Sequence, residues 1–239
     1  KKVGLNRSLE NLPDNEEIEL RSRNGKGLKR PELSALQSYA KISYAQDLLD
    51  SNIPESKAMN ERLLRYFPQK LSSLYEKEIL THQLRREIIA TTLAGGIVNR
   101  MGPRFLKERM DKTGASCAEV ARAYIIVREA FDLRKTWDSI EALDGQVPAS
   151  VQLSALRETA RMAERAITWF LTRYDRKPEI TRDIEQFENG IKTVKKNLNT
   201  VVPKELLDTI NRLARNGENN GLPKDCLLYT SDAADDRSC

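Results

Sequence analysis

The chain has 239 residues, of which 39% are hydrophobic and 31% charged, with a formal net charge of +5 and a sequence pI near 9.0. This length allows one large or two small domains, and the composition is typical of amphipathic helices. No apolar run is long enough for a transmembrane helix, and three cysteines, Cys117, Cys226 and Cys239, allow neither a disulfide framework nor a zinc spacing. We therefore expect a cytoplasmic protein with no membrane partner.

Basic and acidic residues alternate along much of the chain, as in the segment RETARMAER at 157–165. Such mixing is typical of solvated helix faces with ion pairs three or four residues apart. A nucleic-acid surface is the alternative for a basic protein, but it would show a basic stripe with aromatic platforms, which this sequence lacks. We expect no nucleic-acid partner.

The first two predicted helices are separated by a glycine-containing break. A short helix is expected near Glu16–Arg23 and ends at Gly25-Lys26-Gly27. A second begins at Arg30-Pro31-Glu32, where proline in the first turn costs no hydrogen bond and the acid favours the helix dipole. It continues to about Asp50 with one apolar stripe, formed by Leu33, Leu36, Ala40, Tyr44 and Leu48.

Shorter helices follow in the middle of the chain. One is marked by Met59, Leu63, Leu64 and Phe67 and ends at Pro68, and another is expected over Lys70–Ile79. A longer helix covers His82–Met101 and ends at Gly102-Pro103, where glycine and proline stop one helix before the next begins at Phe105 and continues to Lys112.

The C-terminal half is also predicted to be helical. Ser116 and Glu119 match a capping box, Asp132 can cap the following helix, and long helices are expected from Pro148 to about Tyr174 and from Ile180 to Leu198. The last two predict an antiparallel hairpin with coiled-coil-like packing, and Pro203 starts a final short helix. The predicted fold is an all-α multi-helix bundle with a long antiparallel helical hairpin near the C-terminal end.

The helix at His82–Met101 carries the most informative polar side chains, Arg85, Arg86, Asn99 and Arg100. One interpretation is an ion-pair network with Glu32, Glu78 or Glu141; the alternative is anion binding, for which the arginine fork is suited. Gly95-Gly96 in the same helix indicates either the close approach of a neighbouring helix or a hinge or ligand contact.

Catalytic constellations are not recognisable in this sequence. His82 is the only histidine, which leaves no histidine-pair zinc site, and Gly25-Lys26-Gly27 lacks the spacing of a phosphate loop. Cys117 is expected to be a packed residue rather than a nucleophile. We predict no catalytic, cofactor-binding or metal-binding residue in this chain.

Five segments, in order, carry a family resemblance: NRSLENLPDNEEIELR, GKGLKRPELSALQSYAKI, LLRYFP, HQLRREIIATTLAGGIVNRMG and ARAYIIVREAFDLRKTWDSIEALD. Together they resemble the C-terminal helical region of the large bacterial NAD-specific glutamate dehydrogenases, well over 6–174 and more weakly to about 215. The resemblance implies oxidative deamination of glutamate to 2-oxoglutarate and ammonia, with NAD bound by an upstream catalytic domain of the same polypeptide. It also implies a homo-oligomer.

On this basis four regions are expected: a linker from the upstream domain (1–30), a helical subdomain (31–145), the hairpin with a terminal helix (146–217), and a tail (218–239). From Cys226 the tail resembles adapter-derived ends of translated sequencing reads, with a genuine disordered tail as the alternative.

The helices are expected to pack on the dinucleotide-binding domain or on another subunit. The residues predicted to make this contact are Arg85, Arg86, Asn99, Arg100 and Trp137. Two alternatives remain open: a free-standing helical scaffold that binds proteins through 148–198, and a nucleic-acid binder driven by the positive charge.

Overall fold

The computed structural model describes residues 4–173, 177–197, 200 and 204. These residues form eleven α-helices and one short 3-10 helix, with no strand among them. The all-α prediction is therefore confirmed. The chain divides into two compact units, 1–118 and 119–239, which are taken separately below. No helix within the described residues is both long and apolar enough to cross a membrane.

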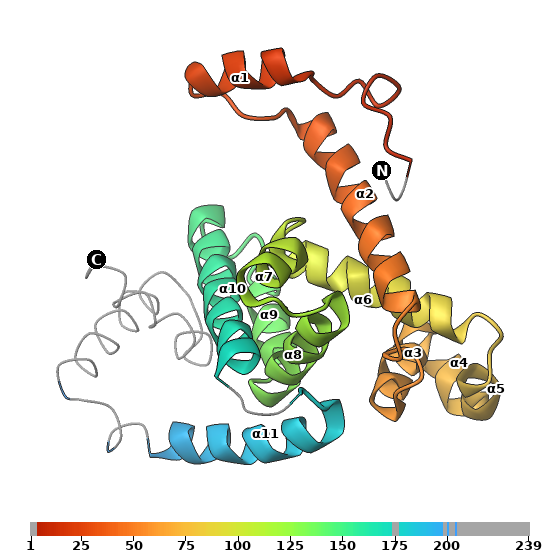
Figure 1. The fold of residues 1–239 in the computed structure, drawn as a ribbon. Helices are drawn as coiled ribbons and strands as arrows, with labels where there is room; N and C mark the ends of the chain where they lie inside the picture. Colours follow the sequence, from red (N-terminus) through yellow and green to blue (C-terminus); the bar gives the residue numbers. More distant parts are fainter. Residues whose placement is uncertain (1–3, 174–176, 198–199, 201–203, 205–239) are drawn as a thin grey trace. The chain divides into compact units, whose positions relative to one another are not determined.

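The first unit contains seven complete helices and the 3-10 helix η1: α1 (Asn15–Arg23), α2 (Arg30–Leu49), η1 (Lys57–Met59), α3 (Asn60–Tyr66), α4 (Gln69–Leu74), α5 (Glu76–Leu80), α6 (Arg85–Met101) and α7 (Phe105–Thr113). Its centre is the packing of α2 against α6, with α3 against the same helix. Figure 1 shows the C-terminal half of α2 crossing α6 while its N-terminal half extends toward α1.

Apolar spacing explains why α6 is the central helix of this unit. Six of its residues are buried, at the three- and four-residue intervals of one helix face: Ile89, Ala90, Leu93, Ala94, Ile97 and Val98. Tyr44 of α2 adds a polar tie, because its buried hydroxyl donates to the Pro103 carbonyl oxygen at 2.8 Å. Burial raises the pKa of Tyr44, so the hydroxyl remains a donor.

The second unit is built on α8 (Cys117–Ala130), which starts at the unit boundary, and on α9 (Leu133–Glu141), α10 (Ala149–Thr172) and α11 (Ile180–Lys196). From Val120 to Val127 most side chains of α8 are buried, as expected for a helix that is apolar nearly all round. The helices α9 and α10 pack together, with Ile140 and Ala155 buried at their contact.

Three local predictions need correction. The single helix expected over Lys70–Ile79 is two helices, because the backbone leaves the helical region at Tyr75 (φ −126°, ψ 36°). The helix expected from His82 begins at Arg85, since the His82 ring accepts the Leu84 amide at 3.1 Å. Asp132 stands at the N-terminus of α9 without a side-chain cap, because its backbone is left-handed (φ 53°) rather than extended as capping requires.

The two helices expected to form the long hairpin are present as α10 and α11, but they are arranged differently. Figure 1 shows α11 crossing the C-terminal end of α10 instead of running back alongside it. An aromatic cluster fixes this crossing: the Phe187 ring lies 4.6 Å from the Phe170 ring and 5.9 Å from that of Trp169. The helix expected from Pro203 and the tail from Cys226 lie outside the described residues.

Candidate functional site

Arg85, at the start of α6, is used inside the first unit. Its guanidinium donates to the Pro54 carbonyl oxygen and, at 2.9 Å, to the side-chain oxygen of Asn60. Pro54 lies in the connection between α2 and α3, Asn60 is the first residue of α3, and the arginine is half-buried there. Arg85 therefore holds this connection against α6.

Arg86 contacts the C-terminal end of α2 and the loop that follows it. It donates to the Leu49 carbonyl oxygen at 2.6 Å and forms an ion pair with Glu55, with both side chains nearly half exposed. Of the expected acidic partners, Glu32 pairs with Arg21 instead, and the other expected pairs stay predictions. The observed partners are the last residue of α2 and one residue of the loop that follows it. Helical periodicity does not predict where that loop returns.

Gly96 lies under an arginine of α3. A β-carbon added to Gly96 would stand 3.3 Å from a terminal nitrogen of Arg62, whereas one added to Gly95 would meet nothing within 4 Å. The Arg62 guanidinium also donates to the Thr92 carbonyl oxygen at 3.3 Å. Close approach, one of the two predicted reasons for this glycine pair, is thus observed at Gly96 and comes from a side chain.

Asn99 and Arg100 lie at the other end of α6. Asn99 is exposed and Arg100 half-buried. Thirteen residues separate Arg86 from Asn99, which is about 20 Å along a helix rising 1.5 Å per residue. The four polar residues of α6 therefore form two separate groups rather than one anion-binding site.

Trp137 is an internal residue of the second unit. It is buried, and its indole N–H donates to the hydroxyl of the fully buried Thr159 at 3.1 Å. This bond joins α9 to α10 and satisfies the polar atoms of both side chains. Any role of Trp137 in docking would be indirect, through its hydrogen bond to Thr159, and this role stays a prediction.

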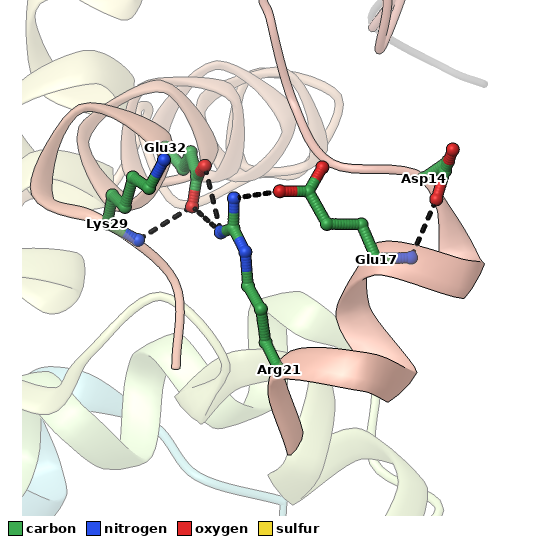
Figure 2. A network of polar contacts seen from close by, with 5 residues as sticks. All are labelled: Asp14, Glu17, Arg21, Lys29 and Glu32. Carbon is green, nitrogen blue, oxygen red and sulfur yellow. Dashed lines mark hydrogen bonds and ion pairs between the residues drawn. The ribbon is translucent and has the colours of Figure 1, made fainter. Parts of the chain in front are cut away.

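The structure shows a polar cluster that the sequence did not predict, at the junction of α1 and α2 (Figure 2). Nη1 of Arg21 lies 3.0 and 2.8 Å from the two carboxylate oxygens of Glu32. Glu17, one turn earlier on α1, binds the same guanidinium. Glu32 also accepts the Lys29 backbone N–H at 2.6 Å. We call this set of residues, Glu17, Arg21, Lys29 and Glu32, the α1–α2 clasp.

The clasp stabilises the charged states of Glu32 and Arg21. The pKa of Glu32 is lowered, mainly by the hydrogen bond from the Arg21 side chain and next by the one from the Lys29 backbone. The bonds to Glu32 and Glu17 raise the pKa of Arg21. The four-residue spacing of Glu17 and Arg21 was a visible signal. The pairing with Glu32 depends on how the chain turns at Gly25, which has a positive φ of 65°.

A second bond supports the same arrangement. The Tyr39 hydroxyl donates to the Glu10 carboxylate at 2.7 Å, and this hydrogen bond raises the pKa of Tyr39. Together with the clasp it fastens residues 10–21 to α2. The described residues of 1–30, expected to be a linker, thus fold onto the second helix; whether they also connect to an upstream domain stays a prediction.

These contacts define an all-helical domain whose prominent polar side chains hold its own elements together. Within the described residues no group of three or more histidine, cysteine, aspartate or glutamate side chains is placed to bind a metal ion. The family model described as glutamate dehydrogenase, C-terminal, matches residues 25–231. The chain belongs to this family.

Curated relatives agree with this assignment. The chain is 42% identical over 167 residues to the NAD-specific glutamate dehydrogenase of Halomonas elongata, which covers 70% of this chain and 10% of that protein. The enzymes of the same name from Pseudomonas aeruginosa and Mycobacterium tuberculosis are 38% and 28% identical over 198 and 228 residues, covering 83% and 95% of this chain. The chain spans only 10–14% of the length of these relatives.

Proposed function

We propose that the chain is the C-terminal accessory region of an NAD-dependent glutamate dehydrogenase, which oxidatively deaminates L-glutamate to 2-oxoglutarate and ammonia. The observation that carries this proposal is the family match over 25–231, together with relatives that are all named NAD-specific glutamate dehydrogenase. NAD and glutamate bind to the part of the polypeptide that precedes this region, and the enzyme works in the cytoplasm as a homo-oligomer.

In this proposal the helices act by docking and not by chemistry. They support the orientation of the dinucleotide-binding domain or contribute contacts between subunits. Of the five residues expected to dock, Asn99 and the exposed part of Arg86 are the accessible ones. Arg85 and Trp137 support this role by holding the domain's own elements in place.

The test is to express the complete reading frame and measure glutamate-dependent formation of NADH. We expect turnover with NAD and glutamate, and lower turnover or altered assembly when Asn99 or Arg86 is replaced by alanine. A complete frame that begins just before Lys1, or a purified product without glutamate-dependent NADH formation, would instead support the free-standing scaffold.

A further inference from the structure

The apolar stripe of α2 is covered at one end and uncovered at the other. Leu48 and Tyr44 are 0% and 9% exposed, whereas Leu33, on the same face three turns earlier, is 50% exposed. An amphipathic helix is stabilised mainly by burial of its apolar face. Within the first unit, the N-terminal half of α2 therefore presents apolar surface that no other element of that unit covers.

The α1–α2 clasp orients this uncovered face. Glu32 directly precedes Leu33 and binds Arg21 of α1 (Figure 2), whereas the Leu33 side chain stays 50% exposed. Leu20, the residue before Arg21, is 60% exposed at the same junction, and α1 has no buried residue. A nine-residue helix without a buried face is too short to be stable in isolation.

We propose that Leu20 of α1 and Leu33 of α2, two exposed apolar side chains at the junction of these helices, dock on the preceding part of the same dehydrogenase polypeptide. The inference rests on the proposed function, because it takes the rest of the enzyme as the occupant. Relatives hold about nine tenths of their length outside this region, and the family is the C-terminal one. The elements α1 and α2 are thus the nearest along the chain to that part.

Connection through one chain also favours this occupant over a separate protein. A tethered partner is present at an effective concentration on the order of millimolar, which is far above that of a second molecule in dilute solution. A modest apolar contact around Leu20 and Leu33 is therefore sufficient for docking within one polypeptide.

The helix itself offers a matched control. Ile42 is 55% exposed, close to the value for Leu33. The two residues are nine positions apart, two and a half helical turns, so they lie on opposite faces of α2. Docking of the Leu33 face leaves Ile42 accessible.

In the experiment, Leu33→Cys and Ile42→Cys are introduced separately into the complete dehydrogenase and labelled with a maleimide. The rate of labelling at each cysteine is measured by mass spectrometry of its peptide. We expect Leu33→Cys to react at least about tenfold more slowly, because the thiol is reached only when the contact opens. Equal rates for the two cysteines overturn the proposal.

Cross-linking identifies the occupant. The exposed amines of Lys26 and Lys29 should link to lysines that precede this region in the same polypeptide. Links to a second copy, distinguished in oligomers mixed from isotope-labelled and unlabelled chains, overturn the proposal, and so do links confined to the 239 residues of this chain. Loss of the proposed enzymatic function would appear separately, as absent NADH formation with the labelling pattern unchanged.

Discussion

The contact of α2 with α6 and the junction of α1 with α2 use one helix in two different ways. At its C-terminal half, α2 buries Tyr44 and Leu48 against a helix with six buried residues. At its N-terminal half it is fastened through Glu32 to a helix that buries nothing. The first contact stabilises the unit by burying apolar area. The second orients α1 relative to α2. We expect that either contact can be disrupted while the other persists.

The largest effect is expected in the α2–α6 contact. Leu93 is fully buried in α6, so Leu93→Ala leaves a cavity and should lower the free energy of unfolding by about 2–5 kcal/mol. Urea unfolding of the chain followed by circular dichroism measures this. The control is Leu74→Ala in α4, where the side chain is 74% exposed and the change should stay within about 0.5 kcal/mol. Similar losses for both variants would contradict the packing.

The internal role of Trp137 predicts a smaller loss. Trp137→Phe keeps a ring in the core but removes the indole donor to Thr159, and should cost about 1–2 kcal/mol of unfolding free energy. Trp169→Phe is the control, because Trp169 is 46% exposed and a phenyl ring can keep the edge-to-face contact with Phe187. A neutral Trp137→Phe variant in the same urea experiment would show that the α9–α10 bond is dispensable.

Alanine substitutions in the glycine pair of α6 separate the effect of helix propensity on stability from that of the close approach of Arg62. Gly95→Ala places a methyl group in open space and should raise the free energy of unfolding by up to about 1 kcal/mol. Gly96→Ala should gain less, because the Arg62 guanidinium must move away from the new β-carbon. Equal gains in thermal or urea unfolding would show that Arg62 places no constraint on this glycine.

The α1–α2 clasp should give a local, pH-dependent effect. The pKa of Glu32 is lowered in the folded chain, so its stabilising contribution is present above the ordinary value of 4.5 and is lost as the pH falls through the folded pKa. We expect the amide protection factors of α1 to fall over that range while those of α6 persist. Hydrogen exchange measures both helices at once.

Glu32→Gln is the control for the clasp. It removes the titrating group and should give low α1 protection at every pH, with α6 unchanged. If wild-type α1 kept the same protection factors on both sides of the Glu32 titration, the clasp would not be what holds α1 on α2.

The difference between the two contacts also explains what the sequence could predict. Periodicity located α2, α6 and α7 to within three residues, because burial against a neighbouring helix leaves a three- or four-residue pattern. The helix α1, which buries no residue, was located by the break at Gly25-Lys26-Gly27. The bonds of Arg21 to Glu32, of Arg85 to Pro54 and of Arg86 to Leu49 join residues 11, 31 and 37 positions apart, and such bonds leave no pattern of this kind. The crossing of α10 and α11 depends on the aromatic cluster at Phe187, and a heptad-like stripe alone suggested side-by-side packing.

The central claim is that this region supports a redox enzyme without performing its chemistry. The most direct measurement compares the purified chain of residues 1–239 with the complete dehydrogenase, each supplied with NAD and L-glutamate. We expect NADH formation by the complete enzyme and none by the chain alone. Reproducible, glutamate-dependent NADH formation by the chain alone would contradict it.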